Sequence, residues 1–77
     1  MYTKGFSFTS FNPVFDAEPR FWRIEFIVLD DRNETVYICR SSETGMLLDW
    51  TEKEIDAILE RQKELRDQYP ESFVGIP

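Results

Sequence analysis

The alternation of apolar and polar residues predicts a β-hairpin in the middle of the chain. Residues 20–30 follow the two-residue period of a strand, and residues 36–41 form a second apolar segment. Between them, residues 31–34 have the composition of a turn, in which Asn33 is able to take a left-handed backbone conformation. We therefore expect the central hairpin over residues 20–41.

Opposite charges on the two strands favour one register of this hairpin. A two-residue loop at Arg32-Asn33 would set Glu25 opposite Arg40, and such cross-strand pairs stabilise a sheet by about 0.2–1 kcal/mol each. Its remaining pairs are Phe26–Cys39, Ile27–Ile38 and Leu29–Val36. A four-residue loop would keep the same faces but set Glu25 opposite Ile38, and we prefer the first register.

The flanking segments predict two further strands and one helix. Residues 4–11 alternate as a half-buried strand, and residues 46–48 are expected to add a short one. Thr51 and Glu54 form a capping box, which places the start of a helix there, and Pro70 ends it. The helix, about 51–69, carries one apolar stripe: Ile55, Ile58, Leu59, Gln62, Leu65 and Tyr69.

These elements predict a single α+β domain over residues 1–77. A small antiparallel sheet of three to four strands would pack on one C-terminal amphipathic helix. One helix covers only one face of such a sheet, whereas the hairpin is apolar on both. We expect the face with Trp22, Ile24, Phe26 and Val28, opposite Tyr37 and Cys39, to lie against the helix.

The second face of the hairpin is the candidate partner-binding surface, because an apolar centre with a polar rim is typical of an interface. Its expected residues are Ile27, Leu29, Val36 and Ile38, bordered by Arg23, Glu25 and Arg40. Two ways of covering it stay open. The phenylalanines of the first fifteen residues or the C-terminal tail could lie over it, or another protein or a second copy of the chain could do so.

Composition and charge exclude several classes of function. The formal net charge of −6 opposes direct binding of nucleic acid and of anionic membranes. No apolar segment is long enough to span a bilayer, and the first residues do not resemble a signal peptide, so we expect a cytoplasmic protein.

Catalytic chemistry is not indicated by any motif. The chain has no histidine, so the usual triads and histidine zinc sites are missing. Cys39 is the only cysteine, and its place in an apolar strand indicates a core residue. The three glycines are isolated, which excludes a phosphate-binding loop. We therefore expect no enzyme, no cofactor and no metal.

Two hypotheses of function follow. The first is a non-enzymatic protein-interaction module or small regulator, with a homodimer as one form. The alternative is an acidic inhibitor that mimics nucleic acid and blocks a basic nucleic-acid-binding protein; small proteins of this type are frequent in phages and mobile elements. The acidic surface for this alternative consists of Asp30, Asp31, Glu34, Asp56 and Glu60.

Overall fold

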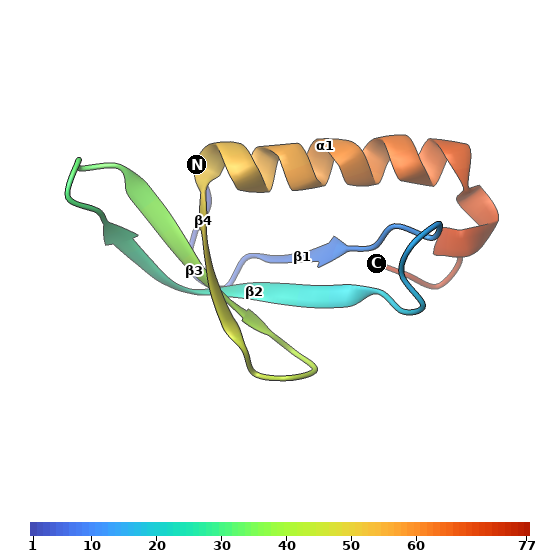
Figure 1. Ribbon diagram of the computed structural model, residues 1–77, viewed down its shortest axis with the longest axis horizontal. Helices are drawn as coiled ribbons and strands as arrows, with labels where there is room; N and C mark the ends of the chain where they lie inside the picture. Colours follow the sequence, from blue (N-terminus) through green and yellow to red (C-terminus); the bar gives the residue numbers. More distant parts are fainter.

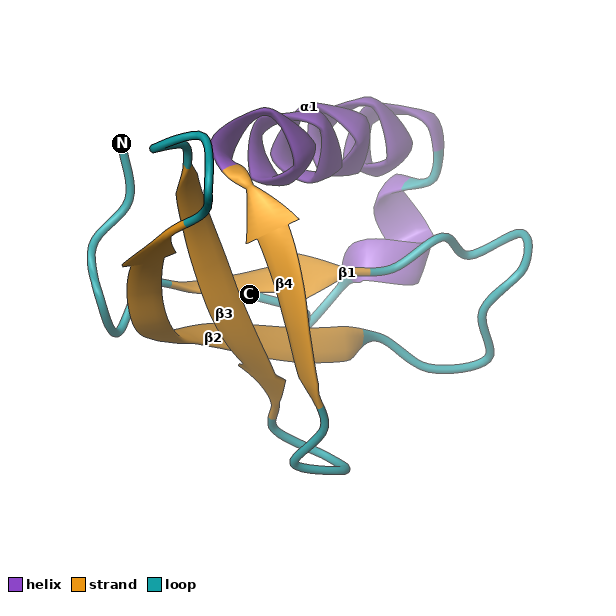
Figure 2. Ribbon diagram, turned by 60° about the vertical axis from the view of Figure 1, so that its left-hand side comes forward, coloured by secondary structure: helices purple, strands orange, loops and turns teal.

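The computed structural model describes residues 1–77 and confirms the α+β architecture. Four strands form one antiparallel sheet in the order β1-β2-β3-β4, so each strand pairs with its neighbour in sequence (Figures 1 and 2). The elements are β1 (Ser7–Ser10), β2 (Arg20–Leu29), β3 (Thr35–Ser41), β4 (Leu47–Thr51), α1 (Glu52–Gln68) and a 3-10 turn η1 (Pro70–Phe73). The helix follows β4 directly and packs against β1, β3 and β4.

The start and end of α1 are fixed by local chemistry. The predicted capping box is confirmed, since Thr51 Oγ1 accepts from the Glu54 N–H at 3.3 Å and Glu54 Oε1 accepts from the Thr51 N–H at 3.0 Å. Trp50, just before the cap, and Ile55 belong to the same apolar cluster, as a hydrophobic staple requires. The helix ends at Gln68, two residues before Pro70.

Removing this cap has a measurable cost. We expect Thr51→Ala to lower the free energy of unfolding by about 1 kcal/mol, because the Glu54 N–H at the helix start loses its acceptor, the Thr51 hydroxyl. Urea unfolding followed by far-UV circular dichroism measures the change. Thr51→Ser retains the hydroxyl acceptor and should recover most of the loss; equal losses in the two variants would contradict a capping role.

The hairpin differs from the expected register because β2 contains a β-bulge. Ile24 is opposite Cys39 and Phe26 is opposite Ile38, so Glu25 is an extra residue without a partner on β3. The preferred register is wrong at every pair, and the four-residue-loop register holds only before the bulge, where Arg23 is opposite Arg40. An extra residue reverses the side to which the rest of the strand points. Beyond Glu25, each side chain of β2 therefore lies on the face opposite to the expected one.

The turn between β2 and β3 explains why the expected two-residue loop does not form. The last strand pair is Leu29 with Thr35, which leaves five residues in the loop. The Asp30 carboxylate accepts from the backbone N–H groups of Arg32 and Glu34, at 2.8 and 2.9 Å, and so holds the wider loop closed. Asn33 has a φ of 61°, and its predicted left-handed conformation is confirmed.

The core lies between the sheet and α1 and has two parts. The larger cluster consists of Phe8, Trp22, Ile24, Tyr37, Cys39 and Ile55, against which Tyr2, Phe6, Trp50, Ile58 and Leu59 pack. The smaller cluster joins the far end of α1 to the tail and consists of Phe11, Leu65 and Phe73, with Ile76 against it. Buried Gln62 lies on the same stripe of the helix, and its Nε2 donates to the Phe11 carbonyl oxygen at 3.0 Å.

Candidate protein-interaction site

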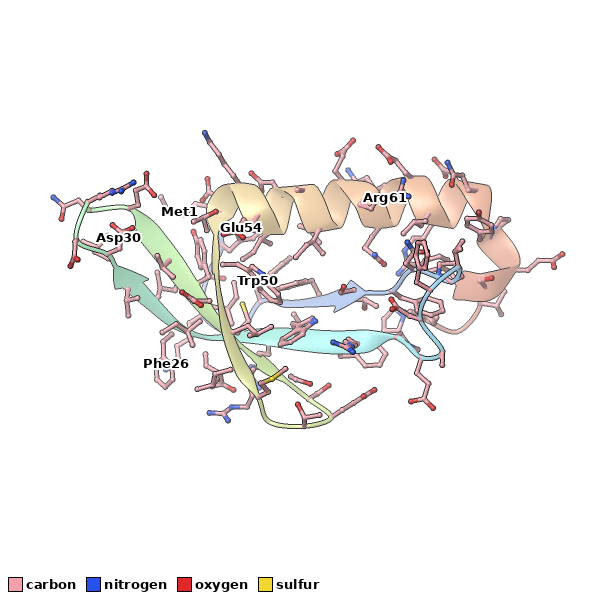
Figure 3. All side chains as sticks on the ribbon, viewed as in Figure 1. Met1, Phe26, Asp30, Trp50, Glu54 and Arg61 are labelled. Atoms are coloured by element: carbon pink, nitrogen blue, oxygen red, sulfur yellow. The ribbon has the colours of Figure 1, made fainter.

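The face of the sheet turned away from α1 carries a continuous group of apolar side chains. Directly opposed residues of neighbouring strands share a face, so the register places Phe26 beside Ile38 and Val28 beside Val36. Figure 3 shows the Phe26 side chain pointing away from the helix. We call this surface the outer face; its residues are Arg23, Glu25, Phe26, Val28, Val36, Ile38, Arg40, Leu47 and Asp49.

The apolar centre of the outer face is exposed. Phe26, Val28 and Leu47 are 48%, 42% and 44% exposed. Val28, Val36, Ile38 and Leu47 line a shallow depression of about 450 Å³, together with Asp30, Leu48 and Asp49. Exposed apolar groups gathered at one place on a folded domain mark a surface for association.

The two ends of the chain lie elsewhere. Phe6 and Phe8 pack in the larger core cluster, and Phe11 packs with Phe73 in the smaller one. The Tyr2 hydroxyl donates to Asp56 on α1, and the Tyr2 N–H donates to the Tyr37 hydroxyl at 3.3 Å. The side chain of Lys4 approaches the edge of the outer face, with Nζ 5.9 Å from the centroid of the Phe26 ring, and Gly5 lies beside the Arg23 side chain. The terminal segments therefore leave the apolar centre of this surface exposed.

Charged side chains of both signs border the apolar centre. The bulge sets Arg23 directly opposite Arg40, which brings two like charges together. Glu25 relieves this repulsion, since its Oε1 lies 3.4 Å from Arg40 Nε. Asp49 adds a second carboxylate from β4, opposite Ile38. The positive charges of Arg23 and Arg40 are thus balanced in number by the negative charges of Glu25 and Asp49. The outer face is therefore close to neutral, although the whole chain has a net charge of −6.

The structure brings four of the six predicted partner-binding residues together. Val36, Ile38, Arg23 and Arg40 lie on the outer face as expected. Ile27 and Leu29 do not, because Ile27 is opposite the buried Tyr37 and Leu29 is two residues further along the same side. Their exposure, 43% and 65%, arises because the hairpin extends past the N-terminal end of α1 (Figure 1).

Sequence reasoning missed Phe26 and Val28, which it assigned to the helix side, and Leu47. The first two assignments were wrong because of the bulge at Glu25. The signal available in the sequence was Asp30, whose carboxylate can close a five-residue loop and thereby shift the register. Leu47 was expected in a short strand, but its face follows only from its pairing with Arg40.

The proposed acidic surface falls into two separate groups. Asp30, Asp31 and Glu34 lie on the loop at the tip of the hairpin, which projects beyond α1, whereas Asp56 and Glu60 lie on the helix itself (Figure 1). Two of the five carboxylates already accept hydrogen bonds within the chain, Asp30 from the loop backbone and Asp56 from Tyr2.

Cys39 is fully buried in the larger core cluster, as predicted. Its Sγ lies 3.8 Å from the Tyr37 carbonyl oxygen. Burial raises the pKa of the thiol from 9.0 to about 11, and the nucleophilic thiolate is thereby disfavoured. Burial also raises the pKa of Tyr2 from 10.0 to about 12, with further contributions from the hydrogen bond to Asp56 and from the negative charges of Asp56 and Glu52.

These two pKa values predict how stability depends on pH. The folded protein holds both protons more tightly than the unfolded chain, so their stabilising effect is complete below about pH 9 and declines as the pH rises toward 12. Urea unfolding between pH 7 and pH 11 measures the decline. Tyr2→Phe and Cys39→Ala should each reduce the loss of unfolding free energy between pH 7 and pH 11. An unchanged loss in both variants would contradict these assignments.

No protein-family model, no curated protein and no solved structure matches this chain. None of its helices has the length and apolar character needed to cross a membrane. The candidate site consequently rests on the geometry described above.

Proposed function

We propose that this protein is a protein-interaction module that associates through its outer face, and that the occupant is a second copy of the same chain. The observation that carries the proposal is the exposed apolar centre made by Phe26, Val28 and Leu47, which no other segment covers. Burying apolar surface stabilises an association by about 25 cal/mol per Å².

The charges of the outer face favour a second copy as the occupant. In a twofold dimer the same surface meets itself, so Arg23 or Arg40 of one copy can meet Glu25 or Asp49 of the other. Of the remaining acidic residues, Asp30 borders the depression, where the loop backbone donates to its carboxylate, and the others lie on the hairpin tip, on α1, on η1 and in the loops. Salt screens charges beyond about 8 Å under physiological conditions, so their repulsion does not prevent the contact.

Contact between the faces is favoured over pairing of strand edges. β4 lies at one edge of the sheet and could in principle accept another strand. It is only five residues long, however, and Asp49 stands at its centre. Short edge strands and charged side chains disfavour the addition of a further strand.

Light scattering at low and at high salt tests the proposal. We expect a mass twice the 9.2 kDa of one chain at both salt concentrations, because apolar burial depends little on salt. A mass of one chain under all conditions would contradict self-association. If the monomer instead bound a basic protein, with an affinity that falls steeply with salt, the acidic-inhibitor hypothesis would replace this one.

A further inference from the structure

The residues that follow η1 turn back toward β1. We call residues 74–77 the strap. Gly75 has a φ of 80°, a left-handed conformation that favours glycine. The side chain of Ile76 packs against the smaller core cluster, and the Thr9 hydroxyl of β1 donates to the Pro77 carbonyl oxygen at 3.1 Å. The strap thereby connects η1 with β1 (Figure 1).

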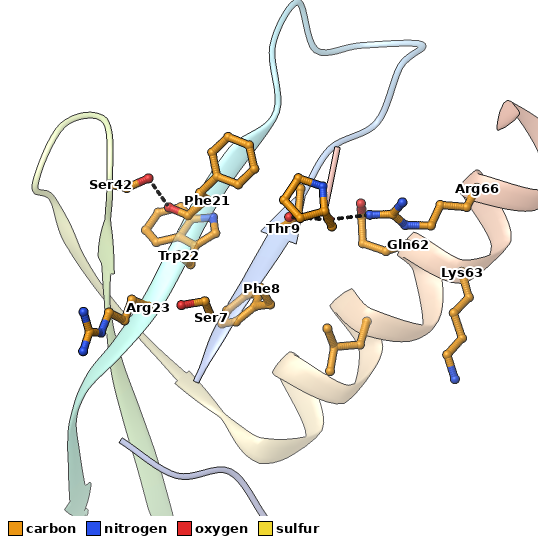
Figure 4. A pocket seen from close by; sticks show the side chains of 12 residues that line it. Ser7, Phe8, Thr9, Phe21, Trp22, Arg23, Ser42, Gln62, Lys63 and Arg66 are labelled. Atoms are coloured by element: carbon orange, nitrogen blue, oxygen red, sulfur yellow. Dashed lines mark hydrogen bonds between the residues drawn. The ribbon is translucent and has the colours of Figure 1, made fainter. Parts of the chain in front are cut away.

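One side chain of α1 holds two carbonyl groups of the strap. Arg66 Nη1 donates to the Ile76 carbonyl oxygen at 3.2 Å, and Arg66 Nη2 donates to the Pro77 carbonyl oxygen at 2.6 Å. Its guanidinium also lies 4.8 Å from the centroid of the Phe73 ring. Figure 4 shows this side chain reaching from α1 toward Thr9 on β1. Arg66 forms no ion pair, so its charged donors serve the strap alone.

The strap is otherwise weakly attached. Residues 74–77 make one hydrogen bond between backbone groups, from the Ile76 N–H to the Phe73 carbonyl oxygen at 3.0 Å. Val74 is 81% exposed, and a Cβ atom added at Gly75 would meet no atom within 4 Å. Segments with few buried contacts and few backbone hydrogen bonds open at a lower free energy than the whole fold. We therefore expect the strap to open without unfolding of the sheet.

The strap also borders a pocket of about 550 Å³, which lies where β1 and β2 meet α1. Thr9, Arg66 and Pro77 are among the residues that line it (Figure 4). When the strap opens, Pro77 leaves the wall of the pocket, and the Thr9 hydroxyl and the Arg66 guanidinium lose their acceptors. Opening therefore widens the pocket and frees donors of both residues beside it.

We propose that the strap opens and closes beside this pocket while the rest of the fold stays intact, and that Arg66 is the latch that holds it closed. The latch consists of two hydrogen bonds from a charged donor, which are stronger than those between neutral groups. Glutamine at position 66 is neutral and shorter, so it cannot replace them. The strap is separate from the outer face, and its opening does not depend on association of the chain.

Amide hydrogen exchange followed by NMR tests the proposal, because the Ile76 N–H donates to the Phe73 carbonyl oxygen in the closed strap. In the unchanged protein, we expect the protection factor of Ile76 to be at least about 100-fold smaller than those of β3, which pairs with a strand on each side. Arg66→Gln should lower the protection factor of Ile76 by about a further tenfold, with a smaller change in β3.

Lys63→Gln provides the matched control. Lys63 also lies on α1 and lines the pocket, but it forms no ion pair and points away from Thr9 in Figure 4. This variant removes the same charge as Arg66→Gln and should leave the protection factor of Ile76 unchanged. Equal effects of the two variants, or a protection factor of Ile76 equal to those of β3 in the unchanged protein, would overturn the proposal.

Discussion

Val28→Asp is expected to abolish self-association, whereas Ile27→Asp should leave it intact. The two residues are neighbours in β2 and are almost equally exposed, at 42% and 43%. Because they lie on opposite faces, only the aspartate at position 28 would be buried in the dimer. An unpaired charge in an apolar interface is strongly unfavourable, and we expect the dimer to dissociate at least about 100-fold more readily.

Sedimentation equilibrium of the two variants measures this difference. Far-UV circular dichroism shows whether each variant is folded, and Ile38→Asp, opposite Phe26 on the outer face, should behave like Val28→Asp. If Ile27→Asp dissociated the dimer and Val28→Asp did not, the surface would be the one expected without the bulge. Loss of association in both variants would contradict an interface confined to the outer face.

The second large effect concerns stability. Ile24 precedes the bulge and is fully buried, so Ile24→Ala should lower the free energy of unfolding by about 2–5 kcal/mol. Leu29, further along the same strand, is 65% exposed. Leu29→Ala should cost less than about 1 kcal/mol, because surface substitutions usually have small effects.

Urea unfolding at a protein concentration where the chain is monomeric compares these two variants without a contribution from association. Comparable losses at the two positions would mean that the half of β2 beyond Glu25 is packed into the core. That result would contradict both the bulge and the exposure of the hairpin described here.

The features of this fold that depend on nearby residues could be predicted from the sequence. The capping box of Thr51 and Glu54 fixes the start of the helix, and Pro70 limits its end. Alternation within each strand predicted the hairpin over 20–41. These signals act over a few residues, so they are readable without knowledge of the rest of the chain.

The faces of the hairpin could be predicted only in part. Both sides of β2 are apolar, so alternation alone does not show where an extra residue is inserted. The bulge at Glu25 depends on the register, which the five-residue loop and the closing contacts of Asp30 help to fix. On β3, which has no bulge, Val36 and Ile38 were placed on the correct face. On β2, Arg23 lies before the bulge and was also placed correctly, whereas Ile27 and Leu29 lie after it and were not.

The pocket of about 550 Å³ that lies where β1 and β2 meet α1 could not be anticipated in the same way. Its residues come from β1, β2, the turn after β3, the helix and the tail, and their proximity arises only when the sheet and helix pack together. The basic residues Lys63 and Arg66 resembled an ordinary solvent-exposed helix face in the sequence.

The most direct test of the outer face is an isotope-filtered NOE experiment on an equal mixture of labelled and unlabelled chains, which detects contacts between copies only. We predict contacts between the ring protons of Phe26 and the methyl groups of Val28, Ile38 or Leu47 across the interface. Contacts that involve Ile27 and Leu29 but none of these residues, or the absence of any contact between copies, would contradict the proposed association.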